Sequence, residues 1–204
     1  MKPKLKILFS ILMITALIFG FIHVYFPADN YSFERLHFFL FNLCTGGTIL
    51  LYYTQGQVRV SKTIRFFFLG SLIYAFSAFF KIYPITILVS IPLFVLVEKI
   101  RIEKFSLFPI LFFKFKEPVS EKFHQASLLC FSCGIVMASL VILNNEYFNF
   151  VTMEKLTLNT FFLGFSFPLS LITLSVVFSM LKKIEGSSSK ILMEICFWTI
   201  TLGV

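Results

Sequence analysis

The chain has 204 residues, of which 58% are apolar and only 14% are charged, and its mean hydropathy is +0.90. A soluble domain carries about 25% charged residues, so this composition excludes a water-soluble globule. The net charge of +8 comes without an aromatic-basic recognition motif, and we therefore expect no nucleic-acid partner.

Long apolar runs recur along the chain, and they approach the length that crosses about 30 Å of hydrocarbon. They predict an all-α, polytopic transmembrane helical bundle of six full spans plus a partial seventh. The predicted spans are residues 5–26, 36–54, 64–80, 84–97, 123–143 and 158–181, with an incomplete span at 191–204. We interpret 1–204 as a single integral membrane domain whose partners are the lipid bilayer and other membrane subunits.

The basic residues are distributed unequally between the two ends of these spans. With the N-terminus in the cytoplasm, fifteen of the eighteen Lys and Arg residues flank inner ends, and Arg35, Lys81 and Lys155 flank outer ends. Cytoplasmic flanks of membrane spans carry an excess of Lys and Arg. This bias predicts a cytoplasmic N-terminus, and we expect a bacterial inner (plasma) membrane protein.

The last apolar run, 191–204, is short for a span. At 1.5 Å per residue it reaches about 21 Å, whereas the hydrocarbon core is about 30 Å thick. We therefore expect the chain to be a fragment of a longer protein that continues through a seventh span.

Two histidines lie at similar depth near the outer ends of the first two spans, His23 and His37. A neutral imidazole is a good ligand for haem iron, so two such residues on adjacent helices could bracket a b-type haem. The alternative is a pair of interfacial histidines that bond to the backbone or to water. His124 lies at the inner start of the fifth span, too far away to share their site.

Span two is the most polar of the predicted helices, and polar groups in a span mark candidate functional sites. It contains Asn42, Thr45 and Thr48 beside Gly46 and Gly47. In a structural interpretation, the glycines let a neighbouring helix approach while the three polar side chains form hydrogen bonds across that contact. In a functional interpretation, the polar side chains line a path.

The same span resembles the second span of haem-copper oxidase and nitric-oxide reductase catalytic subunits. The likeness lies in residues 35–53: Arg35-x-His37, the glycines Gly46 and Gly47, and Tyr52-Tyr53. It implies His37 as an axial haem ligand, with a partner histidine beyond Val204. Span 158–181 departs from the family because it has no histidine where a copper ligand is expected, so the resemblance implies a divergent haem-carrying relative.

Span six carries Pro168 between Ser166 and Ser170. Proline frees a backbone carbonyl and bends a helix, and nearby serines can bond to that carbonyl. Because kinked, hydroxyl-rich helices line pathways in transporters, the alternative function is a small-molecule or ion transporter. Its path would use Asn42, Thr45, Thr48, Ser166, Pro168 and Ser170. A membrane scaffold or assembly subunit is a third alternative.

Span five contains Cys130-Phe-Ser-Cys133, a spacing found in redox pairs. Small residues also recur there at every fourth position: Ala126, Cys130, Gly134 and Ala138. That recurrence is typical of closely packed membrane helices, so we interpret the segment as a packing ridge. The sequence predicts no catalytic or metal-ligating cluster, and whether the chain is an enzyme stays open.

Overall fold

The structure is a computed structural model that describes residues 3–25, 32–56, 60–152, 158–181 and 187–203. Five of the basic residues used to predict the orientation lie outside these ranges: Lys2, Arg59, Lys155, Lys182 and Lys183. The described residues are helical, with short connections and no strand, so the all-α class is confirmed for them.

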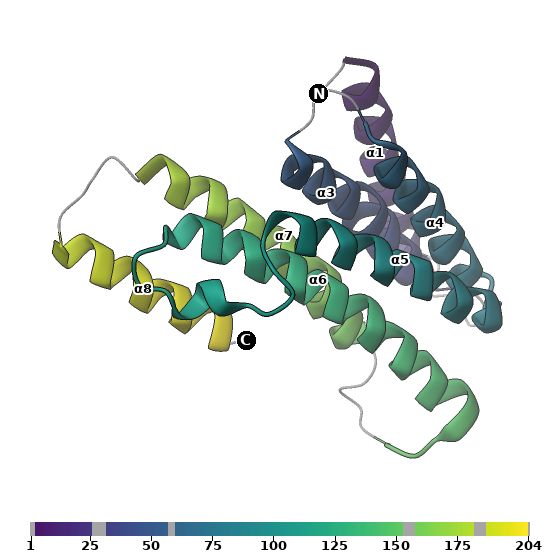
Figure 1. Ribbon diagram of the computed structural model, residues 1–204. Helices are drawn as coiled ribbons and strands as arrows, with labels where there is room; N and C mark the ends of the chain where they lie inside the picture. The colour runs from purple at the N-terminus through teal and green to yellow at the C-terminus, as the bar shows by residue number, and fades with distance from the viewer. Residues whose placement is uncertain (1–2, 26–31, 57–59, 153–157, 182–186, 204) are drawn as a thin grey trace.

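Every predicted span corresponds to a helix (Figure 1). The first is α1 (Pro3–Tyr25), and the second is one continuous helix in three parts: α2 (Phe33–Phe38), the π-helix η1 (Phe39–Gly47) and α3 (Thr48–Gln55). Then follow α4 (Lys62–Phe79), α5 (Tyr83–Lys104), a 3-10 turn η2 (Ile110–Phe113), α6 (Val119–Leu143) with a π-helical extension η3 (Asn144–Phe148), α7 (Leu158–Leu181) and α8 (Ser187–Leu202).

Five helical segments are long and apolar enough to cross a membrane, which indicates an integral membrane protein. They are Leu5–Tyr25, Phe33–Gln55, Lys62–Phe79, Val119–Phe148 and Gly164–Leu181. α8 has 16 residues, fewer than a full span needs.

Local sequence signals explain where several helices begin and end. The hydroxyl of Ser32 accepts a hydrogen bond from the backbone N–H of Arg35 at the start of α2, and Ser61 caps α4 in the same way. Pro84 occupies the first turn of α5, where a missing N–H costs nothing. Gly56 ends α3 in the left-handed conformation, with φ of 57°.

α5 continues seven residues past the predicted end of the span at 97, to Lys104. The added turns are polar, but they carry two ion pairs along the helix. Glu98 pairs with Arg101 at 2.6 Å, and Lys99 pairs with Glu103 at 3.9 Å. Such pairs at i,i+3 and i,i+4 stabilise a helix where it leaves the apolar run.

Buried apolar side chains form two clusters that meet along α6 and α7. The larger cluster includes Leu43 of η1, Phe67 of α4 and Phe131 of α6. The smaller one joins the first half of α6 to the second half of α7 and to α8, through Phe123, Leu171 and Phe197. α6 and α7 therefore form the spine of the molecule, with α1–α5 at one end and α8 at the other (Figure 1).

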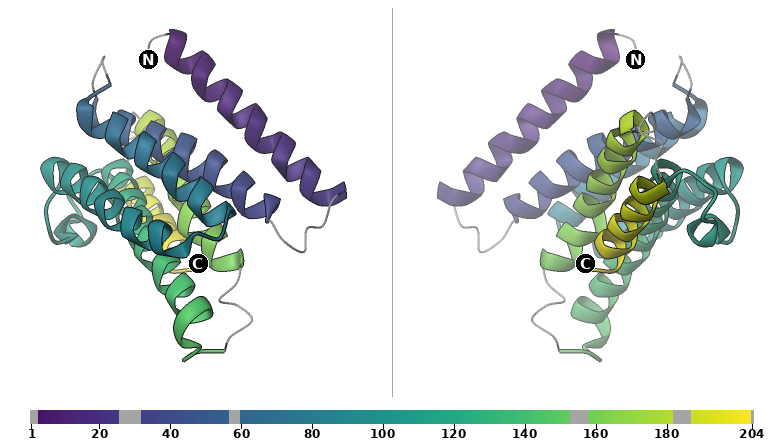
Figure 2. Two further views of the ribbon diagram at one scale, coloured as in Figure 1. Left: turned by 90° about the vertical axis from the view of Figure 1, so that its right-hand side faces the viewer. Right: turned by 90° about the vertical axis from the view of Figure 1, so that its left-hand side faces the viewer.

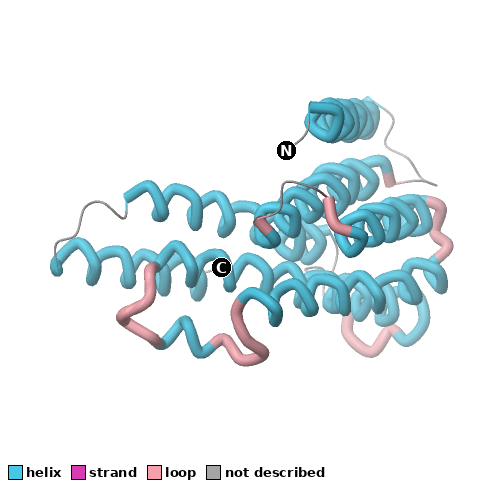
Figure 3. Tube along the Cα trace, turned by 45° about the horizontal axis from the view of Figure 1, so that its top comes forward, coloured by secondary structure: helices cyan, strands magenta, loops and turns pink. Residues whose placement is uncertain are grey.

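α1 lies on the outside of this bundle, and it packs against α2 and η1 (Figure 2). Figure 3 views α1 nearly along its axis, while α7 and α8 run across the picture. Only 11% of the residues in the apolar stretch of α1 are buried, and Ile14, Ile18 and Phe21 are exposed. In a membrane protein such a face contacts lipid.

Candidate functional site

His37 of α2 is anchored to α1. Its Nδ1 donates a hydrogen bond of 2.8 Å to the carbonyl oxygen of Ala16, because a carbonyl can only accept. The imidazole lies on Gly20, where a Cβ atom would stand 3.2 Å from the ring. This bond fixes the tautomer with the proton on Nδ1, and it leaves Nε2 as the nitrogen with a free lone pair.

His23 lies on the same α1–α2 contact, about one helical turn beyond Gly20 on α1. Its Nε2 is 3.4 Å from a carboxylate oxygen of Glu34, and both side chains are about one-third exposed. Its Nδ1 is buried without a hydrogen-bond partner. The predicted proximity of the two histidines to one interface therefore agrees with the structure, whereas Glu34 and Gly20 were not predicted as their neighbours.

Arg35, the other residue of the Arg35-x-His37 pattern, interacts with Tyr83 at the start of α5. The phenol of Tyr83 also forms a hydrogen bond with Glu146 of η3, so the cluster joins three elements. Burial, followed by the nearby Glu146 carboxylate, raises the pKa of Tyr83 above its ordinary value despite the opposing effect of Arg35.

The polar side chains of span two are buried: Asn42 is 7% exposed, Thr48 2% and Thr45 0%. Thr45 donates to the carbonyl of Leu40, and Thr48 donates to that of Cys44. Both hydroxyls therefore bond within their own helix, and the prediction that they bond across the contact was wrong. The hydroxyl of Thr45 reaches five residues back because the helix is π-helical there.

Gly46 and Gly47 have the packing role that the structural interpretation assigned to them. A Cβ atom at Gly46 would lie 2.4 Å from Leu169 of α7, and one at Gly47 would lie 2.4 Å from Phe131 of α6. Span two and span six, proposed as the two sides of a path, thus meet in a closed contact.

The three path residues on α7 differ in how exposed they are. Pro168 is buried, Ser166 is partly buried and Ser170 is exposed on the outside of the helix. Ser127 of α6 donates a hydrogen bond of 2.7 Å to the carbonyl of Pro168. The carbonyl of Pro168 therefore serves the α6–α7 contact. Ser166 and Ser170 lie one turn apart on one face of α7, and Pro168 lies on the other.

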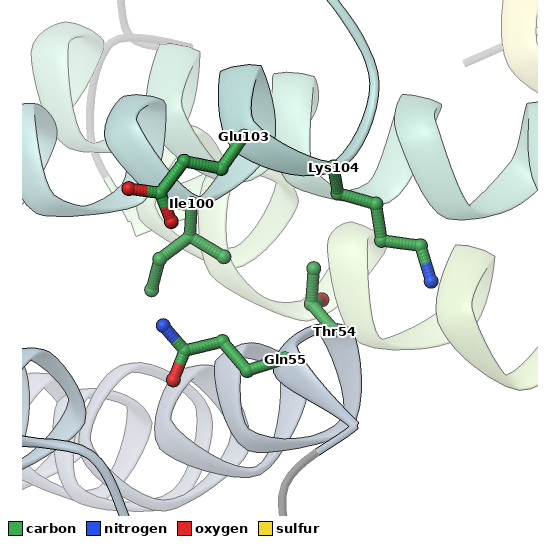
Figure 4. A pocket seen from close by; sticks show the side chains of 5 residues that line it. All are labelled: Thr54, Gln55, Ile100, Glu103 and Lys104. Atoms are coloured by element: carbon green, nitrogen blue, oxygen red, sulfur yellow. The ribbon is translucent and has the colours of Figure 1, made fainter.

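A pocket of about 300 Å³ opens at the opposite end of span two from His37, between the last turns of α3 and α5 (Figure 4). Its lining residues are Thr54, Gln55, Ile100, Glu103 and Lys104. Sequence analysis did not identify this pocket, because its residues on α3 lie 45 or more positions from its residues on α5. Its polar residues come from the last turns of two helices, α3 and α5.

His124 of α6 lies beneath this pocket. The hydroxyl of Thr54 donates to the carbonyl of Leu50 at 2.8 Å, and it accepts from Nε2 of His124 at 2.9 Å. The rings of Tyr53 and Phe105 flank the imidazole at 5.4 and 5.3 Å between centroids. His124 thus lies at the other end of the bundle from His37, as predicted.

Two buried ion pairs were also not predicted. Arg101 is 3% exposed; it binds the Glu98 carboxylate through Nε and Nη2 and donates to the carbonyls of Ser106 and Leu107. Burial acts to raise the pKa of Glu98, but hydrogen bonds from Arg101 and Ser132 outweigh it, so this pKa lies below its ordinary value. The i,i+3 spacing of Glu98 and Arg101 is the sequence signal from which this ion pair could have been predicted.

The second pair, Lys122 of α6 with Glu194 of α8, is buried more deeply and joins distant parts of the chain. Nζ lies 2.6 and 2.8 Å from the two carboxylate oxygens, and Lys122 is 1% exposed. The ammonium also lies 6.0 Å from the centre of the Phe197 ring. A separation of 72 residues gives no sequence signal for this contact.

Comparison with known proteins gives no relative from which a role could be assigned. No protein-family model, no curated protein and no solved structure matches the chain.

Proposed function

We propose that the chain is a multi-pass protein of the bacterial inner membrane, with six full spans, a partial seventh and a cytoplasmic N-terminus. α5 supports a further span by its length, because its 22 residues extend about 33 Å and its charged last turns, from Glu98 to Lys104, can lie among the headgroups. The charges of the described helix ends support the orientation. The ends assigned to the cytoplasm carry Lys6, Lys62, Arg65, Lys99, Lys104 and Lys190 among others, and the opposite ends carry Arg35 and Lys81.

Within this framework, we propose that the protein is a membrane redox protein that holds a b-type haem, with His37 as an axial ligand. One observation carries the proposal: Nδ1 of His37 donates to the Ala16 carbonyl. Histidine ligands commonly donate their second ring N–H to a backbone carbonyl, which fixes the ring and leaves Nε2 for the metal.

The imidazole nitrogens at the α1–α2 contact fit a haem in part. Nε2 of His37 has its lone pair available, and Nδ1 of His23 is a buried nitrogen without a partner. Nε2 of His23, however, lies beside Glu34, and this makes His23 the lesser candidate. Gly20 does not supply space for a macrocycle, because the His37 ring itself covers it.

The chemistry that a bound haem supplies is one-electron transfer. The residues of the chain would hold and orient it. Ala16 fixes the imidazole, and Phe38 and Phe41, whose rings lie 5.3 and 6.0 Å from that of His37, keep its surroundings apolar. Apolar surroundings and the hydrogen bond on the ligand both tune a haem potential.

The test is a reduced-minus-oxidised visible spectrum of the purified protein. We expect a b-haem band that is lost in His37→Gln. Glutamine keeps an N–H donor for the Ala16 carbonyl, so its loss of the band reports ligation and not the packing of α1. His124→Gln is the matched control and should retain the band. A protein without a chromophore, or a band that persists in His37→Gln, would contradict the proposal.

Transport is the second candidate, and its path would have to open along the contact between span two and span six, which is closed at Gly46 and Leu169. Its test is the access of a membrane-impermeant thiol reagent to Thr48→Cys in a protein whose four native cysteines are replaced. Ala75→Cys, buried in apolar packing on α4, is the control. Labelling of Thr48→Cys alone would support an aqueous path. Without such labelling and without haem, the remaining proposal is a scaffold or assembly subunit.

A further inference from the structure

The pocket between the ends of α3 and α5 contains charges of both signs. Glu103 and Lys104 are adjacent residues in the last turn of α5, and Figure 4 shows their side chains directed to opposite sides of the pocket. Gln55 lies across from them on α3. A ligand in this pocket therefore meets an anionic group on one side and a cationic group on the other.

The anionic side of the pocket is available to a ligand. The contact of Glu103 with Lys99 is long, at 3.9 Å, and both side chains are more than half exposed. Exposed pairs of this kind contribute little, so a ligand cation can replace Lys99. Both α3 and α5 also end at the pocket, and the carbonyl ends of helices favour a positive charge.

The cationic side is also available. Within the described residues, Lys104 forms no ion pair with a carboxylate, and its ammonium lies 5.7 Å from the Phe105 ring. The Oε1 atom of Gln55 accepts a hydrogen bond of 2.7 Å from Ser61. That bond directs the amide N–H groups of Gln55 into the pocket on the side of Glu103, so the cationic side is formed by Lys104 (Figure 4).

The pocket has a rigid, polar floor and an apolar side. Thr54 is held by Leu50 and His124, so its hydroxyl has no further proton to donate. Ile100 supplies the apolar side. Leu107 and Phe108, which follow α5 closely, are exposed, as expected of residues that enter the lipid at the headgroup layer.

We propose that this pocket binds the headgroup of a zwitterionic phospholipid, with a primary ammonium at Glu103 and a phosphate at Lys104. Basic pockets between membrane helices on the cytoplasmic side bind the phosphates of lipid headgroups, and Lys104 supplies the basic group here. The position of the pocket at the inner ends of the helices rests on the proposed orientation. The proposal does not depend on haem.

The experiment measures lipid binding to the purified protein in a neutral detergent by native mass spectrometry. The probes are phosphatidylethanolamine, phosphatidylglycerol and diacylglycerol with identical chains, and soluble phosphoethanolamine. We expect phosphatidylethanolamine to bind more tightly than phosphatidylglycerol, and diacylglycerol to bind least. Binding of soluble phosphoethanolamine at equal affinity would identify the source as a free headgroup and would overturn the lipid assignment.

Substitutions test the contributions of the Lys104 and Glu103 charges to lipid binding separately. Lys104→Gln should weaken both phospholipids about tenfold, since it removes a charge-assisted hydrogen bond. Glu103→Gln should remove the preference for phosphatidylethanolamine over phosphatidylglycerol. Lys114→Gln, an exposed lysine outside the pocket, is the matched control and should bind as the unmodified protein does. Equal binding of the three lipids, or unchanged binding in Lys104→Gln, would overturn the proposal.

Discussion

The backbone of Gly134 on α6 lies directly against the backbone of Gly164 on α7. A Cβ atom at Gly134 would stand 2.3 Å from the carbonyl oxygen of Gly164. That carbonyl lacks its usual helical donor because residue 168 is proline, which has no N–H. The Cα–H groups of Gly134 therefore lie against an oxygen that is free to accept a weak hydrogen bond.

Gly134→Ala should separate α6 from α7 at this point. Because the obstacle is backbone and cannot rotate away, we expect a loss of about 2–3 kcal/mol in the free energy of unfolding, measured in detergent. Gly70→Ala is the matched control: its new Cβ atom would meet a side-chain methyl of Leu93 at 3.1 Å. Its stability should remain within about 0.5 kcal/mol of the original, since alanine favours the helix. Equal effects of the two substitutions would contradict the account.

The Lys122–Glu194 pair should be strongly coupled. Glu194→Met leaves a buried ammonium without a counter-charge and should cost about 3–5 kcal/mol, whereas the double variant with Lys122→Met should cost much less. The exposed pair Lys99–Glu103 supplies the control cycle, in which we expect a coupling below about 0.5 kcal/mol. Additive effects at Lys122 and Glu194 would show that α8 does not dock on α6 through this pair.

Glu98 should make stability depend on pH in the acidic range. Its pKa is lower in the folded protein than in the unfolded chain, so the carboxylate stabilises the fold above the unfolded value of about 4.3. That stabilisation is lost as the pH falls through the folded value. Glu98→Gln should cost about 1–3 kcal/mol at neutral pH. A difference between the two proteins that does not shrink on acidification would contradict this assignment.

Thr54→Val should destabilise the protein by about 1–3 kcal/mol, because it leaves Nε2 of the buried His124 without an acceptor. Thr15→Val is the matched control. The hydroxyl of Thr15 bonds within α1 to Ile11, in an exposed position. We expect a change within about 0.5 kcal/mol for that variant in the same unfolding measurement. A similar loss in both would mean that the bond to His124 contributes nothing specific.

Features that depend on local composition were predictable from the sequence. Apolar runs located all seven helices, and the Gly46-Gly47 pair correctly indicated a close helix contact. The length of helix α5 beyond the predicted span was not predictable from hydropathy, which falls at Glu98, because ion pairs continue the helix to Lys104.

Features that depend on the meeting of distant segments were not predictable. Nothing local in the sequence identifies Gly164 as the partner of Gly134, or Glu194 as the partner of Lys122. Thr45 and Thr48 were expected to bond to a neighbouring helix, but the backbone carbonyls of their own helix lie closer. The pocket beside Thr54 exists because two helices end side by side, which is a property of the assembled bundle.

The orientation of the spans determines the depth of every site described, and topology reporters measure it directly. A reporter that is active only outside the cytoplasm and one that fluoresces only inside are each fused after Tyr83 and after Lys114. The account predicts external activity after Tyr83 and internal fluorescence after Lys114. Both positions reporting the same compartment would contradict the span assignment, and exchanged signals would place the N-terminus outside.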